Sequence, residues 1–115
     1  MVDPSDVHKI GINLCVPAAS EAERRSGISR CYYGCFLVAR KITNMEGVKK
    51  DVHKQVSDKL DKMGYPKLAK DLWILSNARK ACDYDIYNAY VGKDAQLMKK
   101  RSIILIGKLQ EILSV

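Results

Sequence analysis

Arg79, Asp83 and Tyr84 are the residues whose types and spacing most suggest chemistry. Residues four positions apart share one face of a helix, so Arg79 and Asp83 should lie together, with Tyr84 beside them and Tyr87 one turn further on. A guanidinium donates N–H groups in a planar fork that suits carboxylates and phosphates. The group therefore suits phosphate or partner binding, although an exposed ion pair worth about 0.3 kcal/mol is the plain alternative.

Arg79 interrupts a seam that is otherwise apolar. Steps of four and three residues along the expected helix 66–87 connect Leu68, Leu72, Leu75, Cys82 and Ile86 with Arg79. A guanidinium in an apolar seam costs several kcal/mol unless it is paired and hydrogen-bonded. The spacing offers Asp83 as its partner.

Two more candidate groups lie on neighbouring expected helices. Tyr32 and Tyr33 are adjacent in helix 20–43, and adjacent helical side chains point about 100° apart. One tyrosine can therefore pack in the core while the other faces a groove or an interface. His53 lies one position off the apolar stripe of helix 48–63, and it is an acid–base candidate only if the fold brings that helix near Arg79.

Glycine, proline and capping residues divide the chain into helices, and no strand pattern is evident. The expected helices cover residues 3–14, 20–43, 48–63, 66–87 and 94–113, with a loop over 88–92. Ser20 and Glu23 form a capping box, Pro66 suits a first helical turn, and Asp94 is an expected N-cap. Short connections favour antiparallel neighbours. We expect one all-α domain over residues 1–115, an up-down bundle of four main helices preceded by a short N-terminal helix.

Length and composition limit the classes of function. The chain has 115 residues and a net charge of +7, which is too short for a two-lobed enzyme and permits an anionic partner. The longest aliphatic run is residues 103–106, far short of the roughly 18 residues that a membrane span needs. The acidic start MVDPSD does not resemble a secretory signal, so we expect a cytoplasmic protein without a membrane partner.

The four cysteines are expected to be reduced thiols used as small core residues. No CxxC motif is present, and the two histidines show no metal-ligand spacing. The sequence therefore predicts neither a metal site nor a cofactor.

Positive charge gathers on two of the expected helices. Residues 20–41 carry five basic and two acidic side chains, and residues 93–108 carry five basic and one acidic. The densest patch is Lys99, Lys100 and Arg101, which we take with Arg30 as candidate contacts to the phosphate backbone of a nucleic acid. A solvated helix face is the alternative.

Three pieces of the sequence together resemble the HEPN-domain family. Residues 20–41 resemble the family's second helix, in which the pattern Ser-Arg-x-Tyr-Tyr-small-x-Phe is typical. Val52-His53 resembles the histidine of the following helix, and the segment from Arg79 to Tyr84 resembles an Arg-x-x-small-Asp-Tyr signature. The order and spacing of these pieces match over about residues 18–114.

The resemblance implies a helical bundle that forms a homodimer. HEPN domains occur in prokaryotic toxin–antitoxin and anti-phage systems, often beside a minimal nucleotidyltransferase. Many are metal-independent endoribonucleases whose Arg and His, with four to six residues between them, meet at the dimer interface. Counted from Arg79, that histidine would fall at positions 84, 85 or 86, which hold Tyr84, Asp85 and Ile86.

The resemblance therefore leaves two functions open. The first is an RNA-binding or RNA-cleaving homodimer that is degenerate at the usual histidine, with Arg79, Asp83, Tyr84 and His53 as catalytic candidates. The second is a non-catalytic module that docks a cognate antitoxin or nucleotidyltransferase. In the nucleotidyltransferase-paired branch a tyrosine just after the motif can be modified with AMP, and Tyr84 and Tyr87 lie at comparable places.

Overall fold

The regular structure of the chain is helical throughout the described residues. The computed structural model describes residues 2–84 and 92–114, and it contains no strand within these ranges. The helices are α1 (Pro4–Leu14), α2 (Glu21–Ile42), α3 (Val52–Lys62), α4 (Pro66–Tyr84) and α5 (Gly92–Leu113). The predicted all-α bundle is thus confirmed at the level of fold class.

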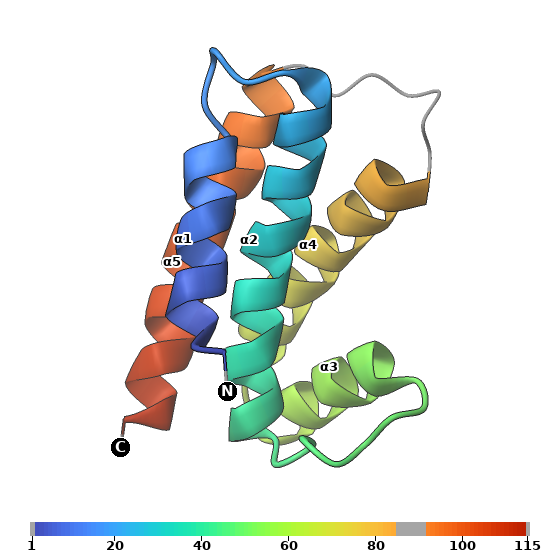
Figure 1. Ribbon diagram of the computed structural model, residues 1–115. Helices are drawn as coiled ribbons and strands as arrows, with labels where there is room; N and C mark the ends of the chain where they lie inside the picture. The colour runs from blue at the N-terminus through green and yellow to red at the C-terminus, as the bar shows by residue number, and fades with distance from the viewer. Residues whose placement is uncertain (1, 85–91, 115) are drawn as a thin grey trace.

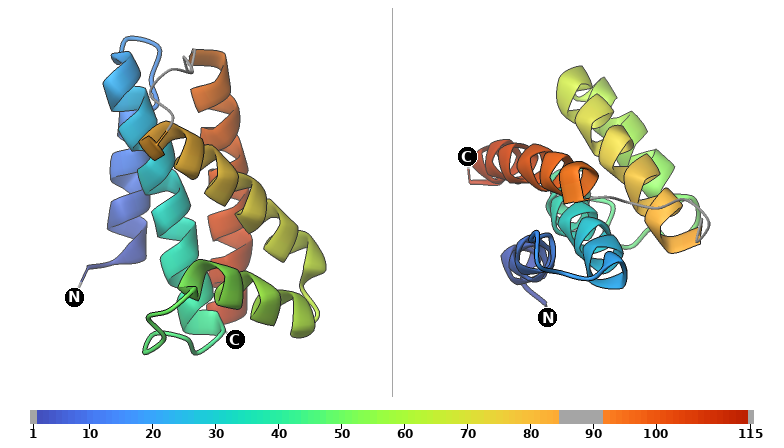
Figure 2. Two further views of the ribbon diagram at one scale, coloured as in Figure 1. Left: turned by 90° about the vertical axis from the view of Figure 1, so that its right-hand side faces the viewer. Right: turned by 90° about the horizontal axis from the view of Figure 1, so that it is seen from above.

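Helix α2 lies at the centre of the arrangement. It packs against each of the other four helices, with α1 and α5 alongside it, α4 tilted across it and the short α3 near its C-terminal end (Figure 1). The views from the side and from above show the same arrangement of the other helices around α2 (Figure 2). A residue on α2 can therefore contact α3 and α4 at once.

The ends of α1 and α2 lie where local capping chemistry predicts them. The Asp3 carboxylate accepts a hydrogen bond from the Ser5 amide at 2.9 Å. The Ser20 hydroxyl accepts from the Glu23 amide, and the Glu23 carboxylate accepts from the Ser20 amide, which confirms the capping box. Each cap satisfies amide groups that the first helical turn leaves free.

Helix α3 begins at Val52, so the predicted start at Val48 is wrong. Arg40 on α2 donates from its guanidinium to the carbonyls of Met45, Glu46 and Val48, which holds this segment in turns. Asp51 then has φ +51°, a left-handed conformation outside the helical region. The helix can form only after that residue.

The bounds of the last two helices also bear on the sequence predictions. Helix α5 begins at Gly92, two residues before the predicted N-cap Asp94, so the expected loop over 88–92 is wrong at its last residue. Helix α4 is described as far as Tyr84. The expected continuation to 87, including Tyr87, and the rest of the loop lie outside the described residues.

The core has two parts, both of which contact α2. The larger cluster includes Tyr32, Phe36, Leu60, Leu72 and Leu105. The smaller one groups Cys15, Ile28, Cys31, Cys82 and Ala95. All four cysteines are free and buried, as predicted. No helix within the described residues is long and apolar enough to span a bilayer.

Candidate functional site

Arg79 lies buried where α4 packs against α2. Only 5% of the residue is exposed, and its Cζ lies 5.4 Å from the ring centroid of Tyr32 and 5.5 Å from that of Tyr33. A desolvated guanidinium over aromatic rings gains about 2 kcal/mol per favourable contact. The two tyrosines therefore form much of the environment that makes this buried charge tolerable.

Asp83 supplies the counter-charge at the edge of the same site. Its Oδ2 lies 3.6 Å from Arg79 Nη1, which is an ion-pair distance and longer than a hydrogen bond. The side chain of Asp83 is 32% exposed and that of Arg79 only 6%. The ion pair is therefore buried at its guanidinium and open to solvent at its carboxylate, so the alternative of an exposed ion pair holds only for Asp83. Ser29 on α2 donates its hydroxyl to the same carboxylate oxygen at 3.4 Å.

His53 joins the site through Tyr32. Its Nδ1 lies 2.5 Å from the Tyr32 hydroxyl oxygen, and its ring stacks on Phe36 with a centroid separation of 4.3 Å. Burial lowers the pKa of His53, and the positive charges of Arg79, Lys80 and Arg40 lower it further. The condition placed on His53 by the sequence, that α3 must lie near Arg79, is therefore met.

The protonation states of this pair follow from their surroundings. Burial raises the pKa of Tyr32 to about 12, against the opposing effects of the Ser76 hydroxyl and Arg79. Near pH 7 the phenol is therefore protonated and His53 is neutral. A neutral imidazole carries one N–H, so the Tyr32 hydroxyl donates to Nδ1 in one tautomer and accepts from it in the other. In both tautomers the Nδ1 of His53 is bonded to Tyr32, which leaves only Nε2 for a ligand.

A polar groove opens beside the buried cluster. It has a volume of about 220 Å³ and is lined by Ser26, Ser29, Arg30, Tyr33 and Asp83. Tyr33 belongs to both the groove and the Arg79 environment, whereas Tyr32 is buried. This division confirms the prediction that one tyrosine packs inside and the other faces a groove. The groove offers hydroxyl groups and one exposed cation, Arg30, to a polar ligand.

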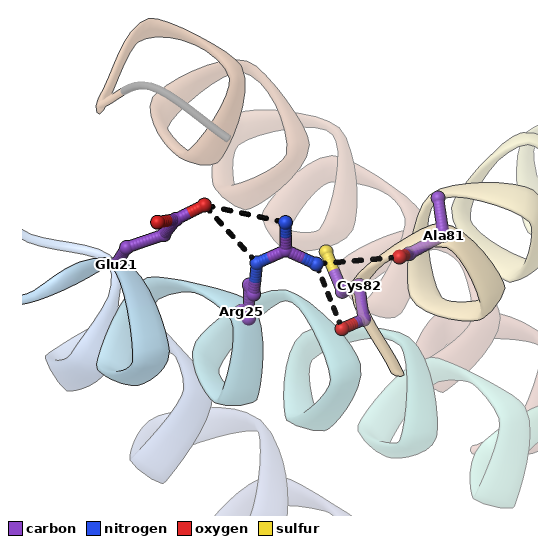
Figure 3. A network of polar contacts seen from close by, with 4 residues as sticks. All are labelled: Glu21, Arg25, Ala81 and Cys82. Atoms are coloured by element: carbon purple, nitrogen blue, oxygen red, sulfur yellow. Dashed lines mark hydrogen bonds and ion pairs between the residues drawn. The ribbon is translucent and has the colours of Figure 1, made fainter. Parts of the chain in front are cut away.

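A second arginine, Arg25, links the N-terminal part of α2 to the C-terminal part of α4 (Figure 3). Arg25 donates to the carbonyls of Ala81 at 3.4 Å and Cys82 at 3.1 Å, and it pairs with Glu21 at 3.2 Å. The last carbonyls of a helix lack intrahelical partners, and an arginine can satisfy them. This contact positions the end of α4 that carries Asp83.

The structure gathers some of the predicted residues and separates others. Arg79 and His53 both contact Tyr32, and Asp83 pairs with Arg79, whereas Tyr84 is 77% exposed. The sequence reasoning missed that both tyrosines flank Arg79. The available signal was the position of Phe36, one helical turn after Tyr32, which marks the aromatic face of α2 that receives His53.

The predicted basic patch is divided among different surfaces. Lys99 is partly buried and its charge acts on Cys15, while Lys100 is exposed. Arg101 lines a groove between α4 and α5, and Arg30 lies on α2 in the other groove. Consecutive helical residues point about 100° apart, so three adjacent cations do not form one surface.

The described residues contain no group of three or more His, Cys, Asp or Glu side chains able to hold a metal ion. Comparisons with protein-family models, curated proteins and solved structures found no match to this chain.

Proposed function

We propose that this chain is a HEPN-like domain that binds RNA as a homodimer in a prokaryotic toxin–antitoxin or anti-phage system. The observation that carries the proposal is the meeting of three separate motif pieces at one site. Tyr32-Tyr33 on α2, His53 on α3 and Arg79 with Asp83 on α4 lie in contact. The antiparallel up-down order of the HEPN bundle and a cytoplasmic location are part of this proposal.

The geometry favours RNA binding over RNA cleavage. Cleavage by the family mechanism needs an arginine that reaches the phosphate and a histidine that exchanges protons. Arg79 is almost fully buried, and the Nδ1 of His53 is held in a hydrogen bond with the phenol of Tyr32, whose pKa is raised to about 12. Arg79 and His53 are therefore positioning residues in this proposal, and the groove that contains Arg30 and Tyr33 contacts the ligand.

The test is an RNA-binding titration followed by a cleavage assay. Fluorescence anisotropy with a labelled single-stranded RNA should show binding that weakens as salt rises, because the protein displaces counterions from phosphates. Arg30→Gln should weaken binding about fivefold at 0.1 M salt, while Lys9→Gln, an equal charge change on the exposed surface of α1, should have no effect. No salt-dependent binding at any protein concentration would reject the RNA function.

Cleavage distinguishes a binding domain from an endoribonuclease. We expect no RNA cleavage by the wild-type protein with or without EDTA. Cleavage that persists in EDTA and disappears in both His53→Gln and Arg30→Gln would show that the domain is a metal-independent endoribonuclease. The non-catalytic part of the proposal would then be wrong.

The outer face of α4 favours a second candidate function, protein docking. Trp73 and Tyr84 are 45% and 77% exposed, and Lys80, which lies between them along the helix, places its Nζ 5.4 Å from the Trp73 ring centroid. Positions 73, 80 and 84 share one helical face, and exposed Trp and Tyr are typical of interface centres. A second copy or a nucleotidyltransferase is the partner we expect for this face.

Sedimentation tests the dimer directly. Trp73→Ala should shift the protein toward the 13.0 kDa monomer, while Ile10→Ala, which truncates an apolar residue of similar exposure on α1, should not. A monomer at micromolar concentration for the wild-type protein would contradict the homodimer.

A further inference from the structure

A basic groove lies between α4 and α5, apart from the Arg79 site. It has a volume of about 210 Å³ and is lined by Lys67, Asp71, Arg101, Ile104 and Lys108. The two helices run at an angle to one another, as the view from above shows (Figure 2). The groove carries three cations and one carboxylate, whereas the groove beside Arg79 carries one of each.

The three cations of the basic groove form no ion pair within the described part of the chain. No ion pair or hydrogen bond joins the side chains of Lys67, Arg101 or Lys108 to another described residue. Like charges around a low-dielectric concavity add their potentials. The groove therefore presents a local positive field that the single carboxylate of Asp71 neutralises only in part.

The spacing of these cations suits a linear polyanion. Arg101 and Lys108 are seven residues apart, so they share one face of α5 about 10 Å apart along its axis, too far for one phosphate to bridge. Lys67 approaches from the first turn of α4. Ile104 lies between Arg101 and Lys108 in sequence and is 59% exposed, which leaves apolar surface among the charges.

We propose that the α4–α5 groove binds the phosphate backbone of single-stranded RNA. Lys67, Arg101 and Lys108 contact successive phosphates, and Ile104 packs against a ribose or an unstacked base. An exposed apolar residue favours a single strand over a duplex, because single-stranded bases can be splayed out against protein surface. This inference rests on the proposed RNA-binding function and assigns it a second surface.

One substitution in the groove should strengthen RNA binding instead of weakening it. The carboxylate of Asp71 lies among the three cations and repels any phosphate that enters. Asp71→Asn should therefore tighten RNA binding, whereas neutralising Lys67, Arg101 or Lys108 should weaken it. A mere effect of net charge would give Lys9→Gln, on α1, the same loss as the groove variants.

The test is anisotropy with a labelled single-stranded RNA between 0.05 and 0.3 M salt. Each contact to single-stranded RNA contributes a slope of about −0.7 in log K against log salt, or about fivefold at 0.1 M salt. Lys67→Gln, Arg101→Gln and Lys108→Gln should each reduce the slope by about 0.7, and the triple variant should bind about 100-fold more weakly. All three positions are exposed, and circular dichroism melting verifies that the variants fold.

The outcomes separate the groove from the proposed function. If the wild-type protein shows no salt-dependent RNA binding, the proposed function fails and the groove inference fails with it. If the wild-type protein binds but the triple variant retains the affinity and slope of Lys9→Gln, the groove inference alone is overturned. Displacement of the RNA by polyglutamate as effectively as by unlabelled RNA would also overturn it, because the groove would then suit an acidic protein.

Discussion

Asp83→Asn should destabilise the protein even though Asp83 lies at the surface end of the site. The substitution removes the carboxylate 3.6 Å from the Arg79 guanidinium. Arginine stays protonated in proteins, so a charge that is 95% buried loses its counter-ion. Breaking a fully buried pair costs about 3–5 kcal/mol. Because water reaches the Asp83 side chain, which is 32% exposed, we expect a loss of about 1–2 kcal/mol.

Arg79→Met should cost less than the burial of Arg79 suggests. It removes the contacts with Tyr32 and Tyr33, worth about 2 kcal/mol each at most. It also removes the desolvation penalty of the guanidinium, which is several kcal/mol, and methionine refills the space between the rings. The net change should lie within about 1 kcal/mol of wild type. With the charge gone, Asp83→Asn should have no further effect.

Urea unfolding of the two single variants and the double variant measures these free energies. A slope of about 2 kcal/mol per molar urea, in the middle of the usual range, turns the expected loss into a midpoint shift of roughly 0.5–1 M for Asp83→Asn. Asp61→Asn, an exposed carboxylate on α3, is the matched control and should leave the midpoint unchanged. If Arg79→Met loses more than about 3 kcal/mol while Asp83→Asn is neutral, the ion pair does not stabilise the buried charge.

Three other predictions concern protonation, helix contact and modification. Burial lowers the pKa of both His8 and His53 in the folded protein, so the unfolded chain binds protons first as pH falls, and the unfolding midpoint should decrease below about pH 6.5. His53→Gln should reduce this pH dependence of stability, and an identical dependence in the variant would contradict the prediction. Gly11→Ala should destabilise the protein by about 1–3 kcal/mol, because its Cβ would lie 2.6 Å from the Cys31 amide nitrogen. Gly107→Ala, whose Cβ would meet nothing within 4 Å, should stabilise it by up to about 1 kcal/mol, and melting temperatures in the reverse order would refute the packing argument. Incubation with a cognate nucleotidyltransferase and ATP should add one adenylate to wild type but not to Tyr84→Phe, and an unchanged intact mass would exclude the modification.

Local chemistry made the first two helices predictable from sequence. The N-caps Asp3 and Ser20 bond to amides within three residues, so each signal lies beside the helix end that it fixes. The start of α3 depends instead on Arg40, which reaches carbonyls five to eight residues away. The apolar residue Val48 continued the α3 stripe in the sequence, so the helix was predicted to start there. No residue near Val48 indicated the contact with Arg40.

In the site, too, the contacts within one helix could be predicted from sequence, and the contacts between helices could not. The pairing of Arg79 with Asp83 follows from four-residue spacing on one helix, and the structure retains it. The contact between Tyr32 and His53 joins two helices, so its geometry depends on how α3 packs and not on spacing. Lys99, Lys100 and Arg101 do not form the single patch predicted from the sequence, because consecutive residues point in different directions around a helix.

Tyr32 makes the core and the site inseparable. It belongs to the larger core cluster, contacts the Arg79 guanidinium and binds His53. A substitution at any of these three positions therefore changes packing and the local field together, and lost RNA binding would have two explanations. Arg30 is exposed on the rim of the groove and outside both core clusters. A loss of binding in Arg30→Gln with unchanged stability is thus the result that assigns function to this surface.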